Sequence, residues 1–192
     1  MAWRRCAQPV IAADRACQSA LAGAVVCVPE PHAISLTTVM ASLELRVPPP
    51  LVVLGVALLM WLAALAVPGL AWHMAARTVC ALVLAALGAG IAVAGVVSFV
   101  RAHTTVNPLK PSAASSLVVT GVYRFTRNPM YLGDLVILIG WAVFLANAVS
   151  FLLLPVFVLY INRFQIGPEE KALAGLFGAG YAAYQSRVRR WL

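Results

Sequence analysis

The residues in this sequence whose types could perform chemistry gather in two short stretches. The first stretch crowds arginine, tyrosine and asparagine side chains into residues 121–133: Tyr123, Arg124, Arg127, Asn128 and Tyr131. The second is the acidic pair Glu169-Glu170. Arginine and asparagine donate hydrogen bonds to carboxylates, carboxylates accept them from ammonium or hydroxyl groups, and aromatic rings flank cations. The mixture predicts a site for a charged cofactor that carries an amino group, a carboxylate and hydroxyls.

Long apolar runs must position these stretches. The chain has 192 residues, of which 62% are hydrophobic and 10% charged, a composition that excludes an ordinary soluble domain. The apolar runs cover residues 51–67, 78–100, 131–146 and 149–166. Each is close to the length that crosses a hydrocarbon layer about 30 Å thick. We therefore predict an all-α fold, an integral-membrane helical bundle with about four transmembrane helices.

The connections between the runs predict how they pack. Asn147-Ala148 is a tight turn, so the last two runs should form an antiparallel hairpin. Small residues in the second run predict a close helix contact: Ala81, Ala85 and Ala89 at four-residue spacing, then Gly88, Ala92 and Gly95. For residues 168–192 we predict a separate C-terminal amphipathic helix on the cytosolic side, because Pro168 suits a first helical turn.

The positive residues predict the orientation. They gather at one end of the expected bundle: Arg46, Arg101, Lys110, Arg124, Arg127, Arg163, Lys171, Arg187, Arg189 and Arg190. The opposite end carries only Arg77. Since cytoplasmic loops are enriched in lysine and arginine, we expect a multi-pass protein of a bacterial inner membrane with both termini cytoplasmic.

The N-terminal residues are expected to stand apart from the membrane domain. Charged residues and prolines interrupt every apolar stretch before residue 47, so residues 1–46 predict a disordered extension. Met40 begins a short segment that leads into the first apolar run, and a second hypothesis places the true start there. The membrane domain is expected to cover residues 47–192.

Two other classes of function are excluded by pattern. The net charge is +8, but the basic residues flank apolar runs instead of forming a stripe on a soluble fold, so no nucleic-acid partner is predicted. The four cysteines, Cys6, Cys17, Cys27 and Cys80, form no C-x-x-C pair, and no histidine stands at metal spacing. No metal site is predicted. The expected partners are the lipid bilayer and a lipophilic small molecule or lipid.

Asp134 is an acid about one turn into the third apolar run. Intramembrane acids are costly and are functional candidates by default. Three interpretations stay open. Asp134 could pair with Arg124 or Arg127, it could face an acceptor substrate, or it could be a water-facing carboxylate at the interface.

Both polar stretches resemble a known signature. Residues 121–133 and the tail resemble the isoprenylcysteine carboxyl methyltransferase and phospholipid methyltransferase superfamily; the tail elements are Glu169-Glu170, Phe177-Gly178, Tyr181, Tyr184, Arg187-Val188 and Arg190-Trp191. The resemblance covers residue 51 to the end. It implies a membrane methyltransferase that uses S-adenosyl-L-methionine without a Rossmann domain. The implied cofactor-binding residues are Ser115, Ser116, Leu117, Val118, Tyr123, Arg127, Asn128, Pro129, Tyr131 and Glu169, and the candidate catalytic residues are Arg127, Asp134 and Glu170.

The sequence departs from that signature at three positions. Val122 replaces a common proline, and Asn128 replaces a common histidine, which removes a titratable ring. Gln165 stands where members specific for prenylcysteine tend to carry arginine, so the resemblance does not extend to that substrate.

The expected reaction is direct methyl transfer to a lipophilic carboxylate, amine, hydroxyl or thiol. A neutral amine or hydroxyl acceptor would need a base, and Asp134 or Glu170 is the candidate. Two alternatives remain at this stage. One is a steroid-reductase-like membrane oxidoreductase that uses a nicotinamide cofactor, and the other is a non-enzymatic membrane protein that keeps the fold.

Overall fold

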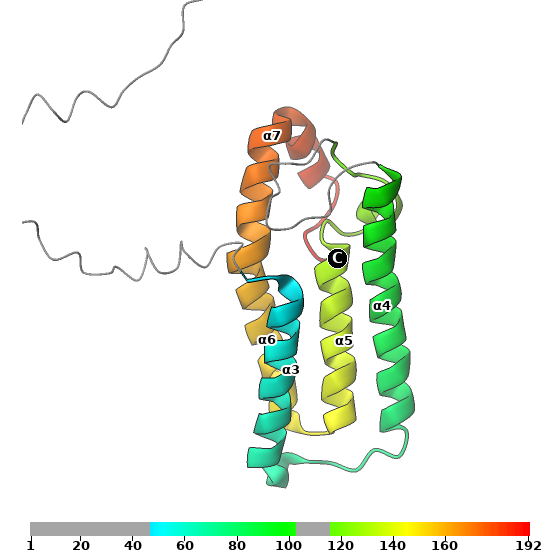
Figure 1. Ribbon diagram of the computed structural model, residues 1–192, viewed down its shortest axis with the longest axis vertical. Helices are drawn as coiled ribbons and strands as arrows, with labels where there is room; N and C mark the ends of the chain where they lie inside the picture. Colours follow the sequence, from blue (N-terminus) through cyan, green and yellow to red (C-terminus); the bar gives the residue numbers. More distant parts are fainter. Residues whose placement is uncertain (1–46, 103–115) are drawn as a thin grey trace, which may run out of the picture. The chain divides into compact units, whose positions relative to one another are not determined.

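The computed structural model describes residues 47–102 and 116–192, and the regular elements among them are all helices (Figure 1). They are α3 (Pro49–Ala66), η1 (Pro68–Leu70), α4 (Arg77–Arg101), η3 (Gly121–Arg124), α5 (Pro129–Leu145), α6 (Ala148–Ile161), η4 (Asn162–Ile166) and α7 (Gly167–Gln185). The predicted N-terminal extension 1–46, with the possible start at Met40, lies outside these ranges. The expectation of an all-α bundle is confirmed.

Prolines and one asparagine set where the helices begin. Pro49 and Pro129 occupy the first turns of α3 and α5, where a helix needs no backbone N–H from them. Asn147 caps α6, because its side-chain oxygen accepts a hydrogen bond from the Val149 amide at 3.0 Å. The Asn147 amide also donates to the Val67 carbonyl at 2.9 Å, which ties the α5–α6 turn to the end of α3. The predicted hairpin therefore has a fixed geometry.

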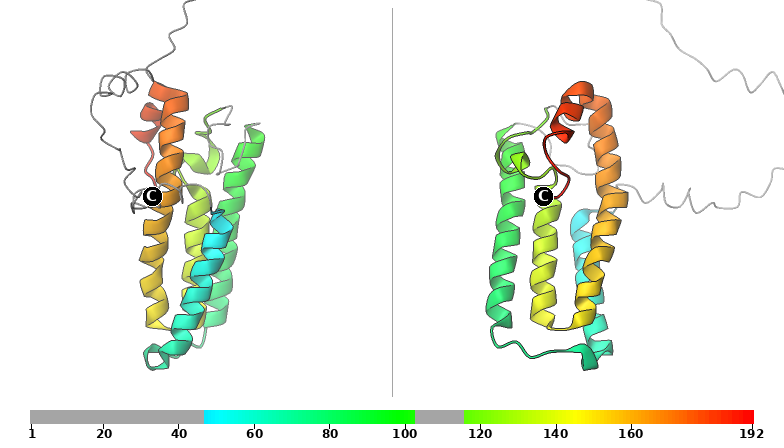
Figure 2. Two further views of the ribbon diagram at one scale, coloured as in Figure 1. Left: turned by 60° about the vertical axis from the view of Figure 1, so that its left-hand side comes forward. Right: turned by 180° about the vertical axis from the view of Figure 1, so that it is seen from behind.

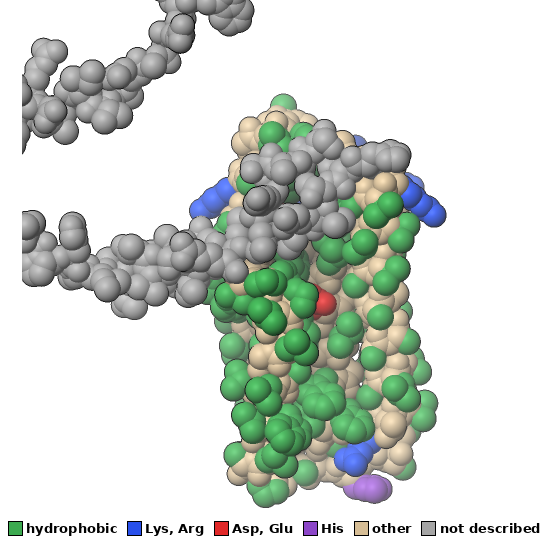
Figure 3. Space-filling model, viewed as in Figure 1, with side chains coloured by type: hydrophobic (Ala, Val, Ile, Leu, Met, Phe, Trp, Pro, Cys, Tyr) green, Lys and Arg blue, Asp and Glu red, His purple; other side chains and the backbone are tan. Residues whose placement is uncertain are grey.

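The helices present apolar surface of the kind that faces lipid. α3, α4 and the helix from Ala148 onward are long and apolar enough to cross a membrane, and α5 is a shorter apolar helix. Large hydrophobic side chains stay exposed on their outer faces, such as Leu54, Leu82 and Leu152 at 65–70%. Figure 3 shows hydrophobic side chains spread along the length of the bundle. Together with the apolar composition, these faces identify an integral-membrane bundle.

Helices α4 and α5 pack side by side through small residues (Figures 1 and 2). The residues that α4 buries are Ala81, Gly88 and Gly95, spaced by seven instead of the four-residue spacing that the alanines suggested. A Cβ added to Gly88 would lie 2.5 Å from the Gly133 carbonyl oxygen of α5. A seven-residue repeat keeps one seam facing its partner over several turns, so the two backbones approach closely along their length.

The last helix does not break where a separate C-terminal helix was expected. α6, η4 and α7 follow one another directly, and the helix is uninterrupted from Ala148 to Phe177. η4 is a π-helical turn in which the Gly167 amide bonds to the Asn162 carbonyl. Pro168 has no N–H for the preceding turn, and a π-turn is one way a helix accommodates a proline. α7 breaks later, at Gly178, whose φ of 49° and ψ of −122° lie outside the helical region.

Candidate functional site

Two helix starts meet at one end of the bundle and bring the two polar stretches together. Tyr131 lies in the first turn of α5, and Glu169 lies in the first turn of α7. The Tyr131 hydroxyl donates a hydrogen bond to Glu169 Oε2 at 3.3 Å. Tyr131 is almost fully buried, so the contact holds the carboxylate in place. The second oxygen of Glu169 receives no hydrogen bond from the residues that the structure describes.

A three-residue ion-pair cluster lies beside this contact. Glu170 Oε1 lies 3.2 Å from Arg127 Nη1, and both side chains are only 13% exposed. Arg190 reaches the same carboxylate, with Nε donating to Oε1 at 3.2 Å and Nη2 to Oε2 at 2.5 Å. The Arg127 contact is close enough to be an ion pair but is not aligned as a hydrogen bond. The buried Nε and Nη1 atoms of Arg127 have no hydrogen-bond acceptor among the described residues.

The C-terminal segment fixes the loop that carries Arg127. The Arg127 amide donates to the Arg189 carbonyl at 3.0 Å. The Thr126 hydroxyl and the Asn128 side-chain amide both donate to the Arg190 carbonyl, at 3.2 and 2.9 Å. Thr126 and Asn128 are buried. Asn128 therefore uses its amide donor to hold the chain end against the loop, a task that needs no titratable ring.

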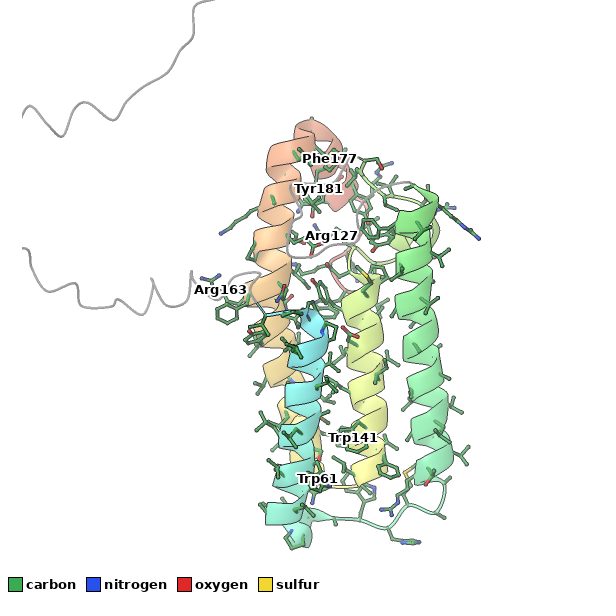
Figure 4. All side chains as sticks on the ribbon, viewed as in Figure 1. Trp61, Arg127, Trp141, Arg163, Phe177 and Tyr181 are labelled. Carbon is green, nitrogen blue, oxygen red and sulfur yellow. The ribbon has the colours of Figure 1, made fainter. Side chains whose placement is uncertain are left out.

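Aromatic side chains close the site on the side of η3 and α7. The Tyr184 hydroxyl donates to the Tyr123 carbonyl at 2.8 Å, and Tyr181 lies next to Tyr184. The Phe99 and Tyr123 rings pack edge to face, with their ring centroids 5.3 Å apart. Burial, assisted by the nearby charge of Glu169, raises the pKa of Tyr123 well above its usual value, so its hydroxyl stays neutral. Figure 4 shows Tyr181 and Phe177 above Arg127, with Phe177 just before the break in α7 at Gly178 and Tyr181 after it.

The break at Gly178 produces this arrangement. A residue with positive φ and this ψ is strained unless it is glycine. The helical segment after it carries Tyr181 and Tyr184, both buried, and electrostatic interactions link both tyrosines to Arg127. The reversal of α7 thus returns the chain to the ion-pair cluster.

Half of the predicted site residues come together in one set of contacts, and the other half do not. Tyr123, Arg127, Asn128, Tyr131, Glu169 and Glu170 belong to the connected set of contacts given above. Ser116 donates to the Ala102 carbonyl at the end of α4 at 3.3 Å, and Val118 is buried while Leu117 is half-buried. Pro129 packs near Gly95 of α4. Ser115 lies outside the described residues.

Asp134 has neither of the arginine partners that its position allowed. It is half-buried on α5, and no ion pair or hydrogen bond joins it to a residue within 47–102 or 116–192. Arg127 pairs with Glu170 instead. Asp134 is thus an unpartnered acid inside an apolar helix.

On the sequence alone, Arg190 and Trp191 belonged to the family signature but had no assigned role in the site. Arg190 supplies both the carbonyl for Thr126 and Asn128 and the guanidinium for Glu170. Trp191 donates its indole N–H to Asn162 of η4 at 3.1 Å and so anchors this segment. The signature marked these two residues, but their types alone did not indicate which groups they contact, because arginine and tryptophan are also common interfacial anchors.

Comparison with known proteins gives a family match that includes Arg127, Tyr131 and the acidic pair of the site and ends before Tyr181. The family model for phospholipid methyltransferase matches residues 76–180. A protein-S-isoprenylcysteine O-methyltransferase of Saccharomyces cerevisiae is 39% identical over 75 residues, which is 38% of this chain and 30% of that protein. The A form from Arabidopsis thaliana is 32% identical over 107 residues, 56% of this chain and 54% of that protein.

A shorter protein matches over its whole length. An uncharacterized protein of Haemophilus influenzae is 46% identical over 63 residues, which is 33% of this chain and all of that protein. The chain spans about a third to a half of the length of the named methyltransferases. No solved structure matches the chain.

Proposed function

We propose that this chain, which belongs to the phospholipid methyltransferase family, transfers a methyl group from S-adenosyl-L-methionine to a lipophilic acceptor. The observation that carries the proposal is the union of the two polar stretches at one end of the bundle. Glu169 bonds to Tyr131, and Glu170 pairs with Arg127. Both contacts join α7 to α5 or to the loop before it, so one ligand can touch both stretches.

The donor groups and acceptor groups left open at this site fit the proposed cofactor. Arg127 keeps two buried N–H groups without acceptors, which suit the carboxylate of an amino acid. Glu169 keeps one carboxylate oxygen for an ammonium group or a ribose hydroxyl. Tyr123, held neutral, offers an aromatic flank. When bound, S-adenosyl-L-methionine supplies an electrophilic methyl group on a sulfonium.

The residues of this chain position the reactants more than they take part in making or breaking bonds. Glu170 is engaged by two arginines, so we assign it to holding Arg127 in position and not to proton abstraction. The Arg190 carbonyl fixes the neighbouring loop. Correct placement of two reactants can be worth about 7–11 kcal/mol of barrier in favourable cases. The rigid set of contacts around Arg127 serves that purpose, and Asp134 is left as the group that can meet the acceptor.

We also propose that the site faces the cytoplasm. Lysine and arginine within the described ranges concentrate at the end of the bundle that carries the site, and Arg77 lies at the other end. This distribution is the one that places an end of a membrane protein on the cytoplasmic side.

The experiment that tests the proposal measures cofactor binding to the full chain in lipid nanodiscs. We expect Glu169→Gln to weaken S-adenosyl-L-methionine binding at least about tenfold, because a charge-assisted hydrogen bond is worth about 1.5–3 kcal/mol. Lys171→Gln, an exposed change two residues further along α7, is the matched control and should leave the affinity unchanged.

Two results would contradict the proposal. One is the absence of S-adenosyl-L-methionine binding to the unaltered protein. The other is stabilisation against heat by NADPH but not by S-adenosyl-L-methionine, which would favour the oxidoreductase alternative.

A further inference from the structure

The end of the bundle that carries the site exposes charge of one sign. Within the described ranges its exposed charged side chains are all basic: Arg101, Arg124, Arg163, Lys171, Arg187 and Arg189. Figure 3 shows basic side chains projecting on both sides of this end. Glu169 and Glu170 are half-buried and pair with groups inside the site. No exposed acid among the described residues offsets the positive surface, so the surface fits an anionic partner.

Two exposed apolar side chains at this end stand close to exposed arginines in the sequence. Phe125, which follows Arg124, is 73% exposed, and Leu192, three residues after Arg189, is 72% exposed. They are the most exposed large hydrophobic side chains in the described ranges, and neither belongs to a membrane-spanning helix. Apolar side chains beside cations are typical of a surface that enters the headgroup layer, where the apolar group leaves water and the cation meets phosphate.

The tertiary structure joins the two segments that carry these side chains. The Arg127 amide donates to the Arg189 carbonyl at 3.0 Å, and the Thr126 hydroxyl donates to the Arg190 carbonyl at 3.2 Å. α5 begins two residues after Arg127, so both segments lie near the level at which the bundle enters the membrane. Two stretches that are more than 60 residues apart in the sequence thus form one surface.

This surface, here called the interfacial patch, comprises Arg124, Phe125, Arg189 and Leu192. We propose that the interfacial patch binds the headgroups of anionic phospholipids and that this binding strengthens the cofactor site. Guanidinium groups donate paired hydrogen bonds to phosphate oxygens, and the two apolar side chains fit the boundary between headgroups and acyl chains. A soluble acidic protein would match the charge of the patch, whereas a lipid also matches its level in the membrane.

The link to the cofactor site rests on the proposed function. The segments that carry the patch are the ones that hold Arg127, the residue assigned to the cofactor carboxylate. A lipid that bridges both segments favours the state in which they are hydrogen-bonded to each other. A cofactor that binds this state therefore binds more tightly when the lipid is present, and the lipid gains the same factor from the cofactor.

The first test measures equilibrium binding of phosphatidylglycerol and phosphatidylcholine to the full chain in detergent, resolved by native mass spectrometry. We expect phosphatidylglycerol to bind more tightly. The double variant Arg124→Gln/Arg189→Gln should weaken its binding about twentyfold, because each basic residue near an anionic surface contributes about fivefold. Phe125→Ser, which keeps the charge, should weaken it about fivefold.

A matched double variant separates the patch from a general effect of positive charge. Arg163→Gln/Lys171→Gln removes the same charge from two exposed residues of the last helix. Figure 4 shows Arg163 projecting away from Arg127. This variant should keep most of the affinity for phosphatidylglycerol. Equal losses in the two double variants, or equal binding of the two lipids to the unaltered protein, would refute the patch.

The second test measures S-adenosyl-L-methionine affinity in nanodiscs of phosphatidylcholine with and without phosphatidylglycerol. Phosphatidylglycerol should raise the affinity of the unaltered protein about fivefold, a value at the low end of typical coupling between two sites. The gain should vanish in Arg124→Gln/Arg189→Gln and persist in Arg163→Gln/Lys171→Gln. All three proteins should bind the cofactor equally in phosphatidylcholine alone, which also demonstrates that the variants fold.

The two measurements fail in different ways. If phosphatidylglycerol binds the patch but the gain in cofactor affinity is absent, or is equal in both double variants, the link to the cofactor site is refuted. If the unaltered protein does not bind the cofactor in either lipid, the proposed function fails, and the mass spectra still decide whether the patch binds anionic lipid.

Discussion

Removing the charge of Glu170 should destabilise the protein more than any other single change in the ion-pair cluster. Glu170→Gln keeps the shape of the side chain but leaves Arg127 and Arg190 facing a neutral amide. The Arg127 and Glu170 side chains are each 13% exposed, whereas that of Arg190 is 39% exposed. The Glu170–Arg127 contact, here called the Arg127 arm, is therefore more buried than the Glu170–Arg190 contact, the Arg190 arm. The two contacts should contribute differently to the free energy of unfolding.

The size of the effect follows from that difference. Leaving one charge of a fully buried pair without its partner costs about 3–5 kcal/mol, and an exposed pair is worth about 0–1 kcal/mol. The Arg127 arm is close to the buried limit, so we expect Glu170→Gln to lower the free energy of unfolding by about 3 kcal/mol. Arg190→Gln leaves the Glu170–Arg127 contact in place and removes the more exposed arm. It should cost about 1 kcal/mol.

The assay is unfolding by SDS titration in mixed micelles, followed by circular dichroism, on Glu170→Gln, Arg127→Gln, Arg190→Gln and the two double variants that contain Glu170→Gln. The coupling energy between Glu170 and Arg127 should exceed that between Glu170 and Arg190. Lys171→Gln, exposed on the next residue, is the control and should change stability by less than about 0.5 kcal/mol. A loss below that value in Glu170→Gln, or a larger coupling to Arg190, would refute the reasoning.

Two further substitutions test the helix contact and the Tyr131 contact. Gly133→Ala should destabilise the protein by about 1–3 kcal/mol in the same titration, because the new Cβ would lie 2.5 Å from a carbonyl oxygen of α4. Gly90→Ala, which meets nothing within 4 Å, should be neutral or stabilising, and equal losses in both would contradict close packing. Tyr131→Phe should weaken S-adenosyl-L-methionine binding about fivefold by releasing Glu169. Tyr160→Phe is its control, and an unchanged affinity in Tyr131→Phe would remove Tyr131 from the site.

The sequence by itself determined the helices and the end of the bundle that carries the polar groups. Four apolar runs gave the spans to within a few residues, because hydrocarbon thickness and backbone hydrogen bonding leave an α-helix as the only local solution. Prolines marked the starts of α3 and α5 for a reason that is also local. The thirteen residues 121–133 and the pair Glu169-Glu170 identified the family by their types and order.

Only the tertiary structure decided which of these groups touch. The pairing of Glu170 with Arg127 and Arg190, and the use of the Arg190 carbonyl by Asn128, join residues 20 to 62 positions apart. No local pattern distinguishes those partners from other charges at the same end. The absence of an arginine beside Asp134 within the described ranges is likewise a property of packing. The position of a residue along a membrane-spanning helix follows from the sequence. Which side chain it contacts depends on how helices that are distant in the sequence pack against one another.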